Sequence, residues 1–192
     1  MYIDDIKKII NENSLVTENI LDSCLKDIKD AIDLMTEGIV RDKKILWCGN
    51  GGSAADAQHM AAELMGGLVS HDRKPIASIA LTTDCSFITA WSNDTDYASI
   101  FSRQIEGLGK QGDILVAIST SGNSENVLNA INSAINKKIK VIVLTGKTAG
   151  KMKNLGDVKI CIPSNNTQRI QEGHLLVEHI LCESIEEFVM KE

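Results

Sequence analysis

The chain has 192 residues and a formal net charge of −6, with 26 acidic against 20 basic residues. This length suits a single domain with one sizeable hydrophobic core, and the acidic balance argues against nucleic acid as a main partner. No apolar run approaches the roughly 20 residues of a membrane-spanning helix, and the N-terminus lacks the apolar stretch of a secretory signal. We therefore expect a cytoplasmic protein without nucleic-acid or membrane partners.

The first 41 residues predict two helices, because apolar residues recur there at helical spacing and no strand pattern interrupts them. Ser14 is a candidate N-cap of the second helix. We interpret this stretch, about residues 1–41, as a helical extension of a single domain that covers residues 1–192. The five cysteines lie far apart without C-x-x-C spacing, which favours reduced thiols.

Short apolar runs then alternate with helical patterns. The runs, each expected to form a strand, cover residues 45–48, 76–81, 114–118, 141–144 and 158–162. Strands that alternate with helices predict an α/β fold in which helices cover both faces of a mostly parallel sheet of about five strands. A long apolar stripe over residues 170–189 predicts a closing helix.

The first of these strands ends in Cys48-Gly49-Asn50-Gly51-Gly52-Ser53, ahead of a helical run. Glycine pairs also mark ordinary turns, but ligands of such sheets bind at the carboxyl ends of the strands. This position makes the loop a candidate sugar-contacting loop.

The helical run that follows carries His59 and Glu63, which share one helix face about 6 Å apart along the axis. This pair suits a shared metal ion or a base with its partner, whereas a simple surface pair is the alternative. Further along, Asn93 and Asp94 follow a strand and a helical stretch. They could bind hydroxyl groups or form a plain turn.

The third strand ends in a loop rich in hydroxyl groups, Ser119-Thr120-Ser121-Gly122-Asn123-Ser124, which opens onto another helical run. Backbone N–H groups at a helix start lack intrahelical partners and carry partial positive charge, so they bind anions well. A plain N-cap needs one hydroxyl, and this loop has four. The loop therefore predicts a phosphate site that needs no lysine.

Taken in order, the motifs G-N-G-G-S, H-x-x-x-E, N-D, S-T-S-G-N-S and R-I-Q-E-x-H-x-x-x-x-H resemble those of the phosphoheptose isomerases of the sugar isomerase (SIS) superfamily. The match covers about residues 45–185, and the full set is far more specific than S-T-S-G-N-S alone. The resemblance implies a flavodoxin-like SIS fold and a homotetramer with zinc. It also implies conversion of sedoheptulose 7-phosphate to D-glycero-D-manno-heptose 7-phosphate for lipopolysaccharide or capsule. Family members can carry aspartate where this chain has Gln168, so an acidic role there is absent or moved.

The resemblance also assigns residues by motif. The implied zinc ligands are His59, Glu63, Gln171 and His179. The implied substrate contacts are Asn50, Gly51, Gly52, Glu63, Asn93, Asp94, Ser119, Thr120, Ser121, Ser124 and Gln171. A ketose-to-aldose shift needs a base that takes a proton from C1 and returns it at C2 through an enediol, and we assign that step to Glu63. His179 would move protons at the oxygens, and zinc would polarise the carbonyl.

Two rival functions use the same fold. The first is a non-catalytic SIS tetramer that binds a protein partner such as a replication initiator; it has no need of Glu63, Gln171 and His179 together. The second is another sugar-phosphate enzyme, an etherase or an amino-sugar isomerase, and these relatives are generally built with different catalytic helices.

The implied ligand set carries a geometric difficulty. On one straight helix, Gln171 and His179 lie about 12 Å apart along the axis and roughly 80° apart in direction, too far to share a metal ion. Gln171, His174 and Glu178 share a face better, which makes His174 the competitor of His179. Gln171 and His179 can meet if Gln171 precedes the helix, which Gly173 would weaken, or if each site draws on two subunits. We therefore expect an obligate oligomer with interfacial active sites.

Overall fold

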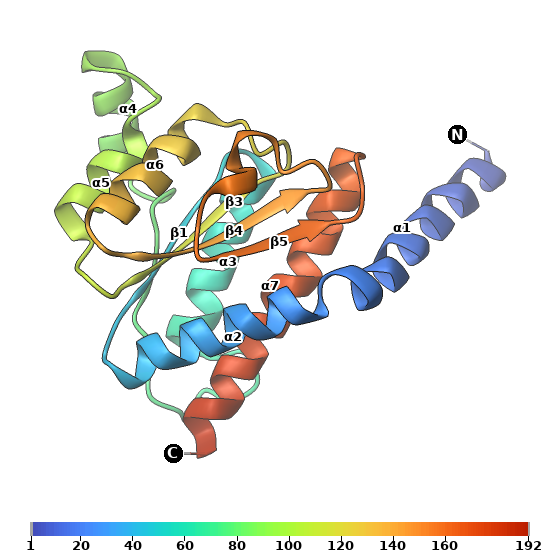
Figure 1. Cartoon of the computed structure of the whole chain (residues 1–192), viewed down its shortest axis with the longest axis horizontal. Coiled ribbons are helices and arrows are strands. Elements are labelled where there is room, and N and C mark those ends of the chain that lie inside the picture. The colour runs from blue at the N-terminus through green and yellow to red at the C-terminus, as the bar shows by residue number, and fades with distance from the viewer. Residues whose placement is uncertain (1, 192) are drawn as a thin grey trace.

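The computed structural model describes residues 2–191, and Met1 and Glu192, the two ends of the predicted single domain, lie outside the described residues. A five-stranded parallel sheet forms its middle layer (Figure 1). The strands are β1 (Ile45–Cys48), β2 (Ser78–Ala80), β3 (Ile114–Ser119), β4 (Lys140–Gly146) and β5 (Val158–Ile162). Their order is β2-β1-β3-β4-β5, and each neighbouring pair is parallel. The predicted α/β fold and its five strands are confirmed.

Helices cover both faces of the sheet. One face packs against α1 (Ile3–Ser23), α2 (Leu25–Val40), α3 (Gly52–Gly66) and α7 (Thr167–Lys191). The other face packs against α5 (Ile100–Leu108) and α6 (Glu125–Asn136), next to α4 (Cys85–Asp94) and the short η1 (Gly150–Asn154). Trp47 enters the first core, whereas its neighbours Leu46 and Cys48 enter the second, because side chains alternate along a strand.

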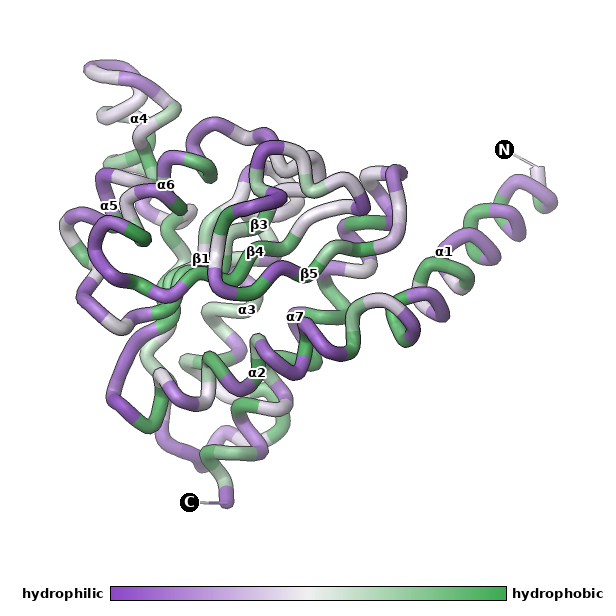
Figure 2. Tube along the Cα trace, in the orientation of Figure 1, coloured by the Kyte–Doolittle hydropathy of each residue, from purple (hydrophilic) through white to green (hydrophobic). Residues whose placement is uncertain are grey.

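The N-terminal extension forms the two predicted helices, but their boundary is not at the predicted cap. Ser14 lies inside α1, where its hydroxyl donates to the carbonyl of Ile10. Serine readily forms this bond within a helix, so the prediction of Ser14 as a cap is wrong. The break falls at Cys24, and the free half of α1 extends away from the sheet with alternating hydrophobic and hydrophilic residues (Figures 1 and 2).

The helices α3 and α7 run side by side in the same direction on one face of the sheet. Gly52 at the start of α3 lies against Gln171 of α7, and about two turns further along α3 Met60 contacts Cys182. Because α7 already begins at Thr167, Gln171 is a helical residue, and the idea that it precedes the helix is wrong. Gly173 does not interrupt α7; it admits Ile162, whose Cγ2 would lie 2.7 Å from an added Cβ.

Within residues 2–191, every helix falls short of the length or the apolar character that a bilayer crossing demands. The five cysteines are free thiols, as predicted, and Cys24, Cys48 and Cys182 are buried.

Candidate active site

The loop after β3 forms a compact cradle, defined here as residues 119–124. The hydroxyls of Ser119 and Ser124 lie 3.0 Å apart, and the Ser121 hydroxyl accepts the backbone N–H of Asn123. Ser124 occupies the N-cap position of α6, yet among the described residues its hydroxyl caps no backbone N–H. The first turn of α6 is therefore available to an anion, which favours a phosphate site over a plain cap.

Tight backbone packing holds the cradle in place. Gly122 has a φ of 64°, and a side chain there would collide with the carbonyl of Ala149 in the loop after β4. A pocket of about 220 Å³ adjoins the cradle. Its lining residues are Thr120, Ser121, Asn123, Gly146, Lys147, Thr148, Ser164, Asn165, Thr167 and Ile170. The pocket thus combines donors from three strand ends with the N-terminus of the long helix α7.

The loop after β1, residues 49–53, lies beside the cradle because β1 and β3 are neighbouring strands. Asn50 exchanges two hydrogen bonds with the side chain of Asn126, at 2.9 and 2.8 Å, and accepts a third from the Tyr97 hydroxyl at 2.9 Å. Gly52 leaves room for the Gln171 amide, which an added Cβ would strike. Asn50, Gly52 and Gln171 therefore all lie at the cradle end of the sheet.

The predicted catalytic residues Glu63 and His179 lie further along α3 and α7, next to the predicted metal ligand His59. We call these three residues the His–Glu–His cluster. The Nε2 atom of His59 lies 3.0 Å from a carboxylate oxygen of Glu63. The rings of His59 and His179 meet edge to face with centroids 5.0 Å apart. His179 donates from Nδ1 to the carbonyl of Leu175 at 2.8 Å. In a neutral imidazole the other nitrogen, Nε2, then carries the lone pair and can bind a metal ion or accept a proton.

The cluster contains donor groups that suit zinc, but one chain brings together only three of the four predicted ligands. Two imidazoles and a carboxylate are ordinary zinc ligands, so three of the four predicted residues fit the metal in kind. Gln171 lies two helical turns away from His179 on α7 and contacts Gly52 instead. Within residues 2–191, no group of three or more His, Cys, Asp or Glu side chains is arranged to enclose a metal ion as it stands. A closed zinc site would need a further ligand or a small rearrangement.

A buried polar layer lies behind the cluster. His174 donates from Nε2 to the carbonyl of Thr145, and burial lowers its pKa to about 4. Neither carboxylate oxygen of Glu178 has a hydrogen-bond partner within residues 2–191. Burial raises the pKa of Glu178 well above its usual range, and the nearby carboxylate of Asp56 raises it further. His179, which touches His59, is therefore better placed than His174 to join Glu63.

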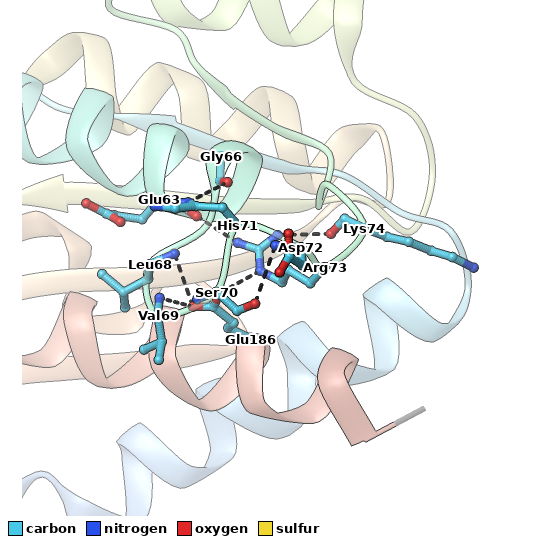
Figure 3. Close-up of polar contacts among 10 residues, drawn as sticks. All are labelled: Glu63, Gly66, Leu68, Val69, Ser70, His71, Asp72, Arg73, Lys74 and Glu186. Atoms are coloured by element: carbon cyan, nitrogen blue, oxygen red, sulfur yellow. Dashed lines mark hydrogen bonds and ion pairs between the residues drawn. The ribbon is translucent and has the colours of Figure 1, made fainter.

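Beyond the cluster, a buried ion pair between Arg73 and Glu186 attaches the loop that follows α3 to α7 (Figure 3). The carboxylate of Glu186 accepts backbone N–H groups of Leu68, Val69 and Ser70, and Arg73 donates to it at 2.9 Å. The same guanidinium donates to the backbone carbonyl of Glu63 at 2.8 Å. Burial alone would raise the pKa of Glu186, but these donors outweigh it and lower the pKa. This network, which the sequence motifs did not reveal, anchors the end of α3 that carries Glu63.

Two predicted positions lie apart from both groups. Asn93 and Asp94 end α4, an exposed helix that stands away from the sheet (Figure 1). Within the described residues their side chains bond to each other, at 2.7 Å, and to neither the cradle nor the cluster. Gln168 is exposed in the first turn of α7, where its backbone N–H donates to the side chain of Asn166.

Comparison with known proteins identifies the family. The SIS domain family model matches residues 8–146. A phosphoheptose isomerase from Sulfurimonas denitrificans is 46% identical over 183 residues, which cover 95% of this chain and 92% of that protein. The chain belongs to the phosphoheptose isomerase family. Since the domain model ends at residue 146, the match over nearly the whole length is what extends the family assignment to α7, with Gln171 and His179.

Solved structures of family members agree with the fold. The phosphoheptose isomerase of Neisseria gonorrhoeae matches with a TM-score of 0.90 and 41% identity, over 96% of this chain and 98% of that one. A phosphoheptose isomerase from Francisella tularensis matches with a TM-score of 0.93 and 36% identity, over 97% of this chain and 100% of that one. The N-terminal helices are therefore shared with these phosphoheptose isomerases.

Sequence reasoning missed several polar residues of this region. Asn126 and Tyr97 hold Asn50, and Asp56 belongs to the layer behind the cluster, next to Glu178, which the sequence had already placed on one helix face with Gln171 and His174. Asn126 could have been noticed, because a polar side chain two residues after the cradle interrupts the apolar face of α6. Tyr97 had no comparable signal, since its partner is 47 positions away in the chain.

Proposed function

We propose that this protein converts sedoheptulose 7-phosphate to D-glycero-D-manno-heptose 7-phosphate, as a step in heptose biosynthesis. Family membership over nearly the whole chain supports the substrate. The observation that carries the chemistry is the convergence of His59, Glu63 and His179 from two helices. A binding protein without catalytic activity would not need this cluster, so the structure favours the enzyme over the non-catalytic alternative.

The residues divide the reaction between them. The cradle, with donors from Ser119, Thr120, Ser121 and Ser124, would hold the phosphate and leave the sugar end free to reach the cluster. Glu63 would take the proton from C1 and return it at C2, and His179 would move protons between the two oxygens of the enediol. Incubation with sedoheptulose 7-phosphate, followed by detection of an aldose phosphate, tests the activity. Lack of product with folded wild-type protein would leave the non-catalytic function as the better proposal.

We further propose that zinc binds at the cluster, held by His59, Glu63 and His179, with Gln171 as the fourth ligand. Bound there, zinc would act as a Lewis acid on the substrate carbonyl. Calorimetric titration with zinc alone tests the site. We expect about one zinc per chain for the wild type and loss of that binding in His59→Ala, whereas equal binding by both proteins would place the metal elsewhere.

The distances within one chain support a site shared between copies. Along α3, His59 and Glu63 lie about 10 and 16 Å from Gly52, where the Gln171 amide is found. Exposed apolar residues of α1, including Ile3, Ile6 and Ile10, offer a surface that association would bury. We therefore propose a homotetramer in which the cluster of one copy works with Gln171 of another. The cluster itself stays in one chain, so the structure does not divide Glu63 from His179.

Mixing of two inactive variants tests the shared site. Co-refolded Glu63→Gln and Gln171→Ala chains should regain activity, because some sites would combine an intact cluster with an intact Gln171 from its neighbour. The matched control mixes Glu63→Gln with His179→Ala, which should recover nothing, since every cluster then has a defect. Equal failure of both mixtures, with mixed oligomers verified, would show that Gln171 and the cluster act within one chain.

A further inference from the structure

A reciprocal amide pair joins the loop after β1 to the cradle. Asn50 donates to the Asn126 carbonyl oxygen at 2.9 Å, and Asn126 donates back to the Asn50 oxygen at 2.8 Å. Asn126 is 3% exposed and lies in the first turn of α6, two residues after the last serine of the cradle. A side chain so deeply buried keeps one orientation because its neighbours surround it, and it can therefore fix the position of its partner.

Tyr97 adds a third bond to this pair. Its hydroxyl donates to the side-chain oxygen of Asn50 at 2.9 Å, from the segment between α4 and α5. The oxygen of Asn50 thus accepts two bonds, and one of its two amide N–H groups is engaged by Asn126. The remaining N–H is the group that Asn50 can offer to a ligand.

The backbone around Asn50 explains why such support matters. Asn50 is followed by Gly51, with a φ of 57°, and then by Gly52. The carbonyls of Asn50 and Gly51 accept the backbone N–H groups of Ser53 and Ala54, which fixes the main chain of the loop. The contacts with Asn126 and Tyr97 therefore act on the orientation of the Asn50 side chain. A shift of about 1 Å in a group that orients a substrate can lower the rate roughly 100-fold.

We propose that Asn126 is a positioning residue which, with Tyr97, orients Asn50 and aligns the sugar-contacting loop with the phosphate cradle. The proposal rests on the proposed isomerase function, in which Asn50 contacts the sugar. Asn126 itself would touch no substrate. It would act through Asn50, and this distinguishes it from a residue that shapes the cradle directly.

A double-mutant cycle tests this dependence. We expect kcat/KM to fall about 10- to 100-fold in Asn126→Ala and in Asn50→Ala, mainly through kcat, and the double variant to be no worse than Asn50→Ala. Multiplication of the two losses in the double variant would overturn the proposal. The matched control is Asn132→Ala on the exposed side of α6, which should keep wild-type kinetics.

A second measurement separates Asn50 from the cradle. Inorganic phosphate should inhibit the wild type and Asn126→Ala with constants that agree within about twofold, because hydrogen bonds of the cradle do not involve Asn126. A parallel loss of phosphate affinity would show that Asn126 supports the cradle instead, and would overturn the proposal.

Tyr97→Phe repeats the cycle without threatening the core, since Tyr97 is 54% exposed. It should lower kcat/KM about 3- to 10-fold in the wild-type background and have no effect in Asn50→Ala. If Asn126→Ala fails to fold, this cycle decides, and independent effects overturn the proposal. A wild type without turnover would overturn the isomerase function and the proposal together, whereas an active wild type with multiplicative losses overturns the positioning role alone.

Discussion

The cradle and the His–Glu–His cluster are built in different ways. The cradle is six consecutive residues whose hydroxyl and backbone groups bond among themselves. The cluster joins His59 to His179, 120 positions away, and exists only where α3 packs against α7. A change in the packing of these helices should therefore damage the cluster while the cradle keeps its affinity for phosphate. The predictions below perturb the cluster, the contacts that hold its helices, and the cradle in turn.

The largest expected effect is on the cluster. Glu63→Gln keeps the size of the side chain but removes the base, so kcat should fall about 100- to 10,000-fold. Incorporation of solvent deuterium at C1 should fall in parallel, whereas inhibition by inorganic phosphate should stay unchanged. Normal proton exchange in this variant would assign the base to another residue, with His179 next in line.

Next comes the buried ion pair that anchors α3 (Figure 3). Arg73→Met leaves the buried Glu186 carboxylate without its cationic partner, and the free energy of unfolding should fall by about 3–5 kcal/mol. Lys26→Met removes an exposed partner of Asp30 and should change stability by less than about 1 kcal/mol. Urea unfolding measures both. Equal small changes in the two variants would mean that the Arg73–Glu186 pair does not hold the loop.

The cradle should respond in affinity. Ser121→Ala with Ser124→Ala removes two hydroxyl donors, and a hydrogen bond to a charged group is worth about 1.5–3 kcal/mol. We expect substrate and inorganic phosphate to bind at least about 100-fold more weakly in titrations, while proton exchange at saturating substrate is nearly preserved. Unchanged phosphate affinity would show that these serines serve the helix start and not a ligand.

The smallest effect concerns the buried layer behind the cluster. Since the pKa of His174 falls to about 4 in the fold, the unfolded chain binds more protons between pH 4 and 6.5. The stabilising contribution is thus complete above about pH 6.5 and is lost as the pH falls, by about 2 kcal/mol between pH 7 and 5. His174→Gln should flatten the stability profile over this range by that amount, as chemical denaturation can measure. An unaltered profile would mean that folding does not lower the pKa of His174.

Much of this protein follows from local patterns in its sequence. The five strands and the helices between them arise from apolar runs and helical spacing, which depend on neighbouring residues. The cradle was predictable for the same reason, because a glycine, several hydroxyls and a helix start stand together in six residues. The family motifs then supplied the chemistry that spacing alone left open, such as the choice between a surface pair and a working His59–Glu63 pair.

Other features depend on contacts between distant segments, and only the tertiary structure decided them. Helical spacing left His174 and His179 as competitors, and the position of α3 beside α7 turned His179 toward His59 and His174 into the core. By its helix propensity Gly173 would weaken the helix, but α7 continues through it and Ile162 packs against it. A local pattern indicates which secondary structure a residue favours. Its burial and its hydrogen-bond partners depend on which distant segments pack against it in the folded chain. The Asn50–Asn126 pair has no local pattern, because its two residues meet only after β1 and β3 have paired.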